Sequence, residues 1–500
     1  MISLNRNFCV LLFSAALICA CARIEPGGEN GTGETLADGV SVTFCLQANP
    51  VDPLTRSVED SYSHVQGTAD EYQVNKARVY FYDSSTKLFA KSFLLSGLKR
   101  SGSDASGNIV YEAEHVQVPQ GTYDIFVVAN SDRVISQENE ADFLADVDKN
   151  TYAKGAIDDI SAGVVMTNRA IDNLGTVIAK KSGNSNDDVV IKIVLERVLA
   201  RLDIGKREET FSLTDKNSKL YARVTPDGYY VVNLARHYYS FRHTAVLNSL
   251  EEPEWSLPTN FGNVSDIDGY VVDPYFFNKK IDATNFTNAD KYYEHFFGDY
   301  NGTEAAPWTP FKPISDTPQY NTIYCLDNCT LAPAQKNGYS TGIVFKAILE
   351  PYNNVYHLNA DGSLELITDK SKYPEVIYYF NYNFYDSPEA LAAAIGISSI
   401  SGVDLDQYQV RTYMMSDEGY RCYYTYWIRH QDNYKNTVMG VMEFAVVRNN
   451  LYRILISDVS ALGDANVDVD PDLPDEGQTY LKVVLNVKPW IVRDLTNIVL

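Results

Sequence analysis

Residues 480–487 have the sequence YLKVVLNV, in which every second position is apolar. A two-residue period is typical of a β-strand with one buried face. An acidic segment that contains prolines, residues 464–478, separates this run from the rest of the chain. We therefore expect residues 479–500 to form a detached strand that needs a partner. Its apolar positions are Leu481, Val483, Leu485 and Val487, and Trp490 provides a second apolar contact.

A second strand near the N-terminus has the same spacing. Its alternate apolar positions are Val40, Val42, Phe44 and Leu46. An arginine that we expect to be exposed follows at Arg56-Ser57. If the N-terminal strand is removed, the C-terminal strand of another copy can take its place, because both strands present four apolar side chains at the same spacing. The pattern predicts a subunit that polymerises. The alternative is that both are ordinary strands of their own chain.

Length and composition limit the function classes. The chain has 500 residues, enough for two or three domains. Its 36 tyrosines and 21 phenylalanines favour strands, because aromatic side chains fit a pleated, half-buried surface. The formal net charge of −23 argues against nucleic acid as a partner, since phosphates would be repelled. We interpret the charge as a solubility feature of a protein outside the cell.

The first 20 residues have the pattern of an export signal. Arg6 supplies a positive charge, and residues 8–18 form an apolar run too short to span a bilayer. The run ends in LICAC (17–21), which resembles a bacterial lipobox, so Cys21 is the expected lipidation site. Ala22 follows, where an inner-membrane retention signal would have aspartate, so we expect the outer membrane. No later run is long enough to cross a membrane, so a transient lipid anchor is the only membrane contact we expect.

The rest of the chain predicts an all-β protein with two β-sandwich domains and few short helices. We assign residues 57–205 to the first domain and 206–463 to the second. Alternating runs occur at 77–82, 109–111, 123–128, 189–195, 198–202, 343–347, 376–380 and 422–427. A hairpin is expected from 443–447 and 451–457, joined by residues 448–450. Helices are expected at 137–147 and between Ser387-Pro388 and Gly396, where the N-terminal and C-terminal capping signals are clear.

Several segments together resemble the type V pilus fimbrillins, the major fimbrial subunit family of lipoprotein-exported pilins. They are GTYDIFVVAN (121–130), LERVLAR (195–201), YCLDN (324–328), TGIVFKA (341–347), YTYWIRH (424–430) and VMGVMEFAVVRNN (438–450). The last two are similar to the C-terminal half of the stalk fimbrillins of short (minor) fimbriae. The resemblance touches both predicted domains and is looser in the long inserts such as 250–320.

The resemblance implies two transthyretin-like β-sandwich domains and assembly by donor-strand exchange. It implies a signal peptide (1–20), a propeptide with an exchangeable first strand (21–56), an acidic tether (464–478) and a donor strand (479–500). An Arg-specific, gingipain-like protease would cut between Arg56 and Ser57. Cutting at Arg23 would open no groove, because Arg23 precedes the strand. The implied location is a fimbrium on the cell surface, with a lipid-anchored precursor in the outer membrane.

No residue pattern indicates a cofactor, a metal site or a catalytic constellation. The alternating acids of residues 464–472 lack the glycine of a calcium loop, so we interpret them as a solvated tether. Three histidines, His237, His243 and His430, have no partners at metal-ligand spacing.

We interpret the cysteines and the tyrosine runs as structural residues. We expect buried free thiols at the mature cysteines, which are Cys45, Cys325, Cys329 and Cys422. The tyrosine runs at 229–230, 238–239 and 378–385 are compatible with a glycan platform, although tyrosines more often serve as strand and core residues.

A structural pilin of the fibre shaft is the function we favour, in support of adhesion and colonisation. Its partners would be identical subunits arranged head to tail, accessory tip and anchor subunits, an Arg-specific protease and a host surface receptor. A tip adhesin that binds host glycan or protein, or an anchor subunit, is the alternative. The complete C-terminal strand favours the shaft, and Arg56 argues against the anchor. An enzyme is the least favoured class.

Overall fold

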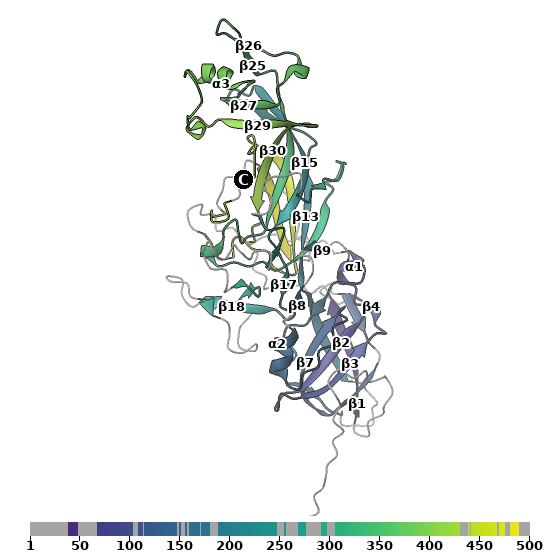
Figure 1. Ribbon diagram of the computed structural model, residues 1–500. Coiled ribbons are helices and arrows are strands. Elements are labelled where there is room, and N and C mark those ends of the chain that lie inside the picture. The colour runs from purple at the N-terminus through teal and green to yellow at the C-terminus, as the bar shows by residue number, and fades with distance from the viewer. Residues whose placement is uncertain are drawn as a thin grey trace, which may run out of the picture.

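The computed structural model describes residues 39–48, 68–103, 109–113, 115–147, 150–151, 156–157, 160–170, 172–180, 189–247, 255–256, 269–276, 292–297, 306–430, 439–440, 442–467, 470–475 and 481–489. Within them nearly all regular structure is β-strand, and three short α-helices occur. This confirms the all-β fold class. Figure 1 shows an elongated molecule with one sandwich at one end, a second in the middle and a small distal unit at the other end.

Ten strands form the first sandwich. They are β1 Gly39–Ala48, β2 Ala77–Asp83, β3 Phe89–Leu95, β4 Lys99–Ser103, β5 Ile109–Glu112, β6 Val116–Pro119, β7 Gly121–Ala129, β10 Met166–Thr167, β11 Thr176–Ile178 and β12 Val189–Arg197. One layer has the order β3-β2-β7, with β11 beside β7. The other has the order β12-β1-β5-β4, with β6 beside β1. The short β10 pairs with both β7 and β12 and joins the layers.

Alternation in the sequence fixes which faces of these strands are buried. In β12 the side chains of Ile191, Ile193 and Leu195 lie in the core, and those between them are exposed. The outer face of β2 and β7 is covered by α2 (Glu140–Val147), whose Phe143 packs against tyrosines of β2. This helix begins three residues later than residue 137, because Asn139 caps it by accepting a hydrogen bond from the Asp142 amide at 2.8 Å.

Two sheets face each other in the second sandwich. The smaller has the order β32-β31-β13-β23-β9, with bounds β32 Leu481–Pro489, β31 Asn450–Val459, β13 Leu199–Lys206, β23 Asn321–Leu326 and β9 Ala156–Ile157. The larger starts with β14 Phe211–Thr214, β15 Leu220–Val232, β24 Gly342–Pro351 and β30 Gly419–Trp427, and β22 Thr309–Pro310 pairs with β15. Apolar side chains of both sheets form one buried cluster between them.

The larger sheet continues beyond the sandwich into the distal unit. Its strands are β29 Arg411–Ser416, β27 Val376–Phe380, β28 Asn383–Tyr385, β25 Val355–Leu358 and β26 Leu364–Leu366. The unit also holds α3 (Pro388–Ile395) and two 3₁₀ turns, η5 Lys370–Lys372 and η6 Leu405–Tyr408. The predicted capping of α3 is confirmed: Ser387 Oγ accepts from the Ala390 amide at 3.2 Å, and Gly396 ends the helix with φ +85°.

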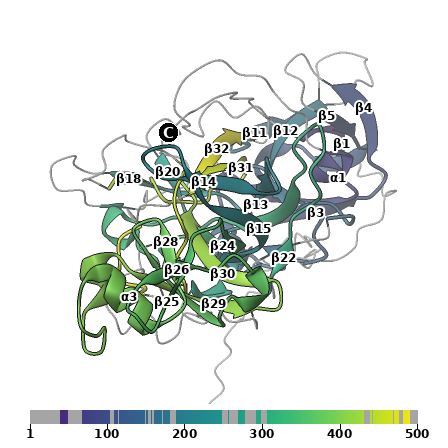
Figure 2. The ribbon, with the colours of Figure 1, turned by 90° about the horizontal axis from the view of Figure 1, so that it is seen from above.

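Short elements surround the junction of the two sandwiches. They are β8 Asn150–Thr151, β16 Leu234–Ala235, β17 His237–Tyr238, β18 His243–Leu247, β19 Trp255–Ser256, β20 Gly269–Val272, β21 Tyr293–Glu294, α1 Ala69–Tyr72 and η4 Ala332–Ala334. β8 pairs with β17, and β9 pairs with β23, so segments of the first half of the chain are hydrogen-bonded to the second sandwich. Figure 2 shows the molecule from above, with β32 beyond β31 and the distal unit nearest the viewer.

The sandwich boundary and one hairpin differ from the sequence prediction. The change from the first sandwich to the second falls at Val198, so β13, which we placed before a boundary at 205, belongs to the second sandwich. The expected hairpin at 443–457 is also wrong in its first arm. Residues 443–447 form a single bridge, from Val446 to Asn328, because Asn328 rather than β31 pairs with this segment.

Candidate assembly site

β1 lies in the middle of the first sandwich and has neighbours on both edges. It pairs in parallel with β12, from Val42 opposite Val189 to Ala48 opposite Leu195. Its other edge pairs antiparallel with β6 along its first half and with β5 along its second half. A strand that replaced β1 could therefore form backbone hydrogen bonds along both of its edges.

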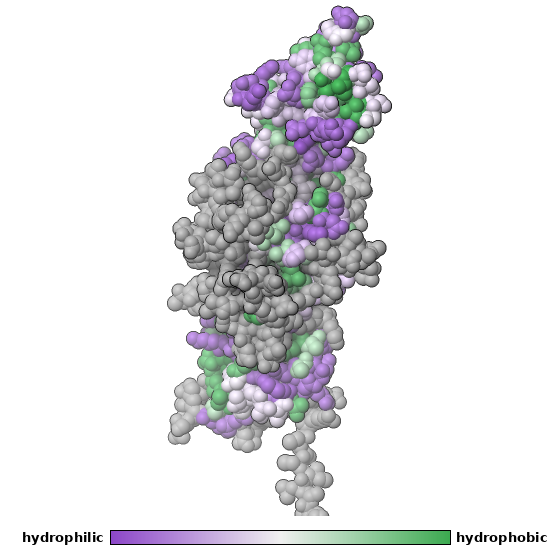
Figure 3. Space-filling view, turned by 90° about the vertical axis from the view of Figure 1, so that its left-hand side faces the viewer, coloured by the Kyte–Doolittle hydropathy of each residue, from purple (hydrophilic) through white to green (hydrophobic). Residues whose placement is uncertain are grey.

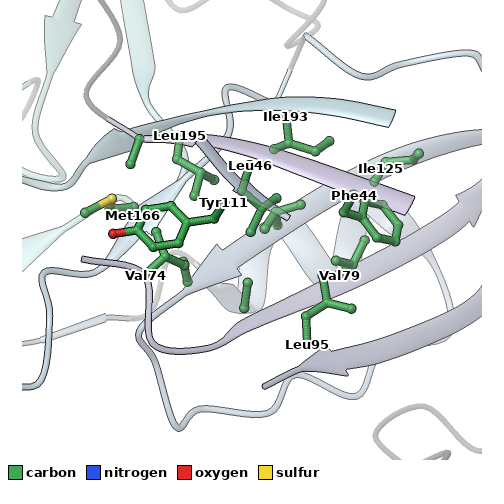
Figure 4. Close-up of a cluster of buried hydrophobic side chains, with 14 of the residues drawn as sticks. Phe44, Leu46, Val74, Val79, Leu95, Tyr111, Ile125, Met166, Ile193 and Leu195 are labelled. Carbon is green, nitrogen blue, oxygen red and sulfur yellow. The ribbon is translucent and has the colours of Figure 1, made fainter. Parts of the chain in front are cut away.

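The predicted apolar positions of β1 all point into the core. Val40 is 5% exposed, and Val42, Phe44 and Leu46 are fully buried. The Phe44 ring packs edge-on against Phe81 of the opposite layer, with ring centroids 6.1 Å apart. Figure 4 shows Phe44 and Leu46 projecting from β1 among side chains of the surrounding strands. Removing β1 would leave an apolar groove between β12 and the β5–β6 edge.

Among the residues that the structure describes, no layer of this kind covers the opposite face of β1. Its alternate residues, which include Thr43, Cys45 and Gln47, are only half-buried. Thr43 Oγ1 lies 3.0 Å from His115 Nδ1, and on the neighbouring β12 the Val190 side chain is 58% exposed.

β32 lies in a different place from the one we expected. Residues 479–500 were expected to be detached, but Leu481–Pro489 pair antiparallel with β31 of the same chain. Among the strands that the structure describes, β31 is the sole partner of β32, so β32 is an edge strand. The reason for the docking is that β31 would otherwise present an unpaired row of N–H and C=O groups, which is a template for another strand. Leu485 lies opposite Ile454 in this register.

Part of the acidic tether, residues 471–475, is docked against residues 335–340. Asp475 is 2% exposed and accepts a hydrogen bond from the Ser340 hydroxyl, and burial raises its pKa well above the ordinary value. The Asn337 amide donates to Leu473 O at 3.0 Å, and the Gly338 amide donates to Pro471 O at 2.9 Å. Backbone pairing therefore holds residues 471–475 against residues 335–340. Asp475 is therefore not solvated, whereas the alternating acids Asp464 and Asp470 are exposed, as predicted.

A buried ionic cluster fixes α1 to both sandwiches. Glu71 is fully buried, and its Oε1 accepts from Arg201 Nη1 at 2.5 Å and from the Tyr324 hydroxyl at 2.8 Å. Arg197 Nε donates to the Glu71 carbonyl at 2.6 Å, and burial lowers the pKa of Arg197 to about 10. Arg201 also forms a two-pronged pair with Asp203. Because buried charges need partners, these residues hold α1 in one position.

A second buried pair joins the sandwiches. Arg448 Nε donates to Asp327 Oδ2 at 2.6 Å, and Arg448 Nη2 donates to Tyr239 O at 2.6 Å. The two residues after Tyr239 contact the first sandwich. Thr167 Oγ1 donates a hydrogen bond to Ser240 O at 2.8 Å, and the Phe241 ring packs on Phe126. The two sandwiches are thus joined by hydrogen bonds and packing on both sides of the junction.

Comparisons with known protein families match two parts of the chain, one in the first sandwich and one in the second. Residues 55–197 match the model of the major fimbrial subunit protein (FimA), and this match ends where β12 ends. Residues 418–496 match the C-terminal model of fimbrillin, the major fimbrial subunit protein type IV, which covers β30, β31, the tether and β32. Both matching models describe fimbrillins, one in the N-terminal part of the chain and one in the C-terminal part. These matches support a fimbrial subunit, a structural component of a fimbrium at the cell surface that assembles with other subunits.

Solved structures similar to this chain include fimbrial proteins. Fimbrilin FimA from Porphyromonas gingivalis is 16% identical, with a TM-score of 0.43 over 91% of this chain and 98% of that one. The tip fimbrial protein Mfa3 from the same organism is 12% identical, with a TM-score of 0.34 over 90% and 100%. A fimbrial assembly protein from Parabacteroides distasonis is 11% identical, with a TM-score of 0.25 over 66% and 99%. No curated protein sequence matches this chain.

Several predicted site residues lie outside the described residues. These are Cys21, Arg56, Ser57 and Trp490. Among the helices that are described, none has the length and apolarity needed to cross a membrane. The described part of the chain likewise contains no group of three or more histidine, cysteine or acidic residues that would hold a metal ion.

The remaining cysteines and histidines have structural surroundings. Cys325, Cys329 and Cys422 are buried free thiols, as expected, and Cys45 is half-buried on the outer face of β1. His430 is buried in the second sandwich, with Nδ1 2.7 Å from the Tyr452 hydroxyl, and burial lowers its pKa to about 4. The ionic cluster around Glu71 was not predicted. Its only local signal is the Thr68-x-x-Glu71 capping box at the start of α1.

Proposed function

We propose that this chain is a shaft subunit that polymerises by donor-strand exchange. In this proposal it is exported as a lipoprotein on Cys21, and an Arg-specific protease cuts it between Arg56 and Ser57. The freed β1 then leaves, and β32 of a second copy enters the groove. The observation that carries the proposal is the position of β1: it is a central strand with its alternate side chains in the core, and the cleavage site follows it before α1.

The apolar side chains supply the affinity of the exchange. Val40, Val42, Phe44 and Leu46 bury their side chains in the groove. At about 1.5–3 kcal/mol for each fully buried side chain of this kind, four of them contribute on the order of 6–12 kcal/mol before ordering costs. The β32 set has the same two-residue spacing and the same number of large apolar residues. While β1 is covalently attached, its high effective concentration keeps a foreign strand out.

After β1 has left, backbone pairing favours the entry of β32 into the vacated groove. β1 has seven paired positions with β12, four with β5 and four with β6, and therefore fifteen in all. β32 has nine paired positions with β31 in its own chain. A strand of this length that moves from the edge to the groove gains about six paired positions. At a net of about 0.5–1.5 kcal/mol per hydrogen bond, this gain amounts to roughly 3–9 kcal/mol.

The ionic cluster explains how the subunit would survive the cut. α1 starts at Ala69, a short distance after Arg56, and Glu71 anchors it to Arg201 and Tyr324. The cut would therefore release the segment that carries β1 while α1 remains fixed. The groove would stay open because its walls, β12 and β5–β6, are held by the rest of the sandwich.

Native digestion of the purified precursor with trypsin tests the proposal. We expect loss of residues up to Arg56, followed by ladders of multimers that resist SDS. Arg56→Ala should abolish both the cut and the ladder, and the control Arg23→Ala should leave both unchanged. A ladder that forms in Arg56→Ala, or a clean cut that gives only monomers, would contradict the proposal. A tip adhesin would give the second of these results.

A further inference from the structure

A cavity of about 800 Å³ opens where the second sandwich meets the distal unit. Its walls come from the start of β15, the turn between β27 and β28, η6, the start of β29 and the segment that follows β31. Figure 1 places these elements at the far end of the molecule from β1. Its size falls within the usual range for small-ligand sites. It is separate from the assembly site and from the ionic cluster around Glu71.

One wall of the cavity is aromatic. The rings of Tyr221 and Tyr379 are stacked, with centroids 6.0 Å apart and planes 29° apart. The Tyr382 ring meets Tyr221 edge-on at 5.2 Å. The carbonyl of Tyr382 accepts a hydrogen bond from Asn354 Nδ2 at 2.8 Å, which fixes the backbone of this wall. Tyr379 and Tyr382 are half-buried, so they retain partly accessible surface.

Polar side chains face the same space. Asn381, Asp406 and Gln409 all line the cavity and are exposed. In the part of the chain that the structure describes, the side chains of these three residues take part in no hydrogen bond or ion pair. They offer two amides and one carboxylate, which together can donate and accept several hydrogen bonds.

The backbone beneath two of these amides is in an uncommon conformation. Asn381 has φ +46°, the adjacent Tyr382 has φ +63°, and Gln409 has φ +56°. Residues other than glycine rarely adopt this left-handed region, and tyrosine is among the less favoured there. Such strained residues cluster at functional sites, where the surrounding structure holds them in place. Here all three line one cavity.

The remaining wall is rigid and does not depend on β32. Arg411 Nη1 donates to Leu462 O and to Gly463 O, the latter at 3.1 Å. The Tyr413 hydroxyl donates to Gly463 O at 2.8 Å, and the Tyr424 hydroxyl donates to Ala461 O at 3.1 Å. These bonds fix the segment after β31 whether or not β32 is paired. They also direct the Arg411 guanidinium to carbonyl oxygens.

The charges of the cavity select among ligand classes. Asp406 and Asp464 contribute carboxylates, and Arg411 lies 3.6 Å from Asp464. The site therefore has no surplus of positive charge, which disfavours an anionic ligand. Neutral sugars combine apolar C–H faces, which pack on tyrosine rings, with hydroxyls, which bond to amides and carboxylates. The distal end presents apolar and hydrophilic residues side by side (Figure 3).

We propose that this cavity is a binding site for a neutral oligosaccharide. The sugar ring packs against the Tyr379–Tyr382 wall, and its hydroxyls bond to Asn381, Asp406 and Gln409. The site is independent of donor-strand exchange, because none of its walls comes from β1 or β32. It would be repeated once in every subunit of a fibre, so weak single-site binding would be strengthened by multivalency.

Binding of the purified chain to a printed array of neutral and sialylated oligosaccharides tests this proposal, with titration of the best neutral ligand by calorimetry. Asn381→Gly and Gln409→Gly remove the amides and keep a backbone that tolerates positive φ. We expect each to weaken binding by about tenfold, the equivalent of one good hydrogen bond. Ser218→Gly is the matched control, because Ser218 also has a positive φ of 62° but lies outside the cavity, and it should bind as the parent does.

Three results would overturn the assignment. The first is that no neutral glycan is retained on the array. The second is that only sialylated glycans bind, because the cavity would then be selecting for negative charge. The third is that the two glycine variants bind a neutral glycan as tightly as the Ser218→Gly control, since binding would then occur elsewhere on the surface.

Discussion

Phe44→Ala should destabilise the precursor and have no effect on the cleaved subunit. Phe44 is fully buried, packs against Phe81 and belongs to the strand that leaves. Truncation of a buried phenylalanine to alanine costs about 3–5 kcal/mol. The equilibrium constant for loss of β1 from the groove should therefore rise by a factor of about 10²–10⁴. The assay is urea unfolding of the precursor and of the trypsin-cleaved, polymerised form, followed by intrinsic fluorescence.

Phe81→Ala is the matched control for this prediction. Phe81 contacts Phe44 across the core but belongs to β2, which stays in the subunit after cleavage. It should destabilise both forms by a similar amount, whereas Phe44→Ala should destabilise only the precursor. Phe44→Ala should also allow some multimers to form without protease. If Phe44→Ala lowers the unfolding midpoint of the cleaved fibre as strongly as Phe81→Ala does, then β1 has not left, and the reasoning is refuted.

Three further substitutions test the ionic cluster around Glu71, the buried His430 of the second sandwich and the donor strand β32. Glu71→Gln removes the buried carboxylate charge near Arg197 and Arg201, although Arg201 keeps its pair with Asp203, and it should cost about 3–5 kcal/mol in urea unfolding. The exposed neighbour Asp70→Asn should cost little. His430 has a folded pKa of about 4, below the ordinary 6.5, so the unfolded chain takes up its proton first. The contribution of neutral His430 to the free energy of unfolding should be fully present above about pH 6.5 and should fall by roughly 3 kcal/mol as the pH drops toward 4. His430→Gln should remove this pH dependence. Leu485→Asp should abolish multimers because it places a charge in the apolar set of the donor, whereas Asn486→Asp, outside that set, should polymerise normally; equal behaviour of the two would count against β32 as the donor.

The regular elements could be predicted where the local pattern and the tertiary burial agree. β1 is a strand with one buried face because its two-residue period continues over ten residues between two partners. α3 begins after Ser387 and ends at Gly396 because both capping signals are local. The strands at 77–82, 123–128 and 343–347 follow the same logic and occur as β2, β7 and β24.

The errors come from partners that lie far away in the sequence. The run at 481–487 has the correct period, but the period does not say that the edge of β31 is free to receive it. Asp475 belongs to an acidic segment that would suit solvent, and a single hydroxyl, from Ser340, gives it a buried place. The sandwich boundary at Val198 falls within LERVLAR (195–201), where no glycine or proline marks a break.

The two features that matter most for function beyond β1 are not local at all. Glu71 meets Arg201 and Tyr324, which are separated from it by 130 and 253 positions. The cavity at the distal unit brings together Tyr221, Asn381 and Asp464, and its strained backbone is a property of conformation rather than of residue type. A single sequence carries no signal for such contacts.

Mixing two half-competent forms of the protein tests the central claim most directly. One form is cleaved and lacks residues 479–500, so it can only accept a strand. The other is Arg56→Ala with residues 479–500 intact, so it retains β1 and can only donate. We expect each form alone to remain monomeric after incubation, and the mixture to give SDS-resistant dimers and nothing longer. Multimers from either form alone, or a mixture that stays monomeric, would contradict donor-strand exchange between β32 and the groove of β1.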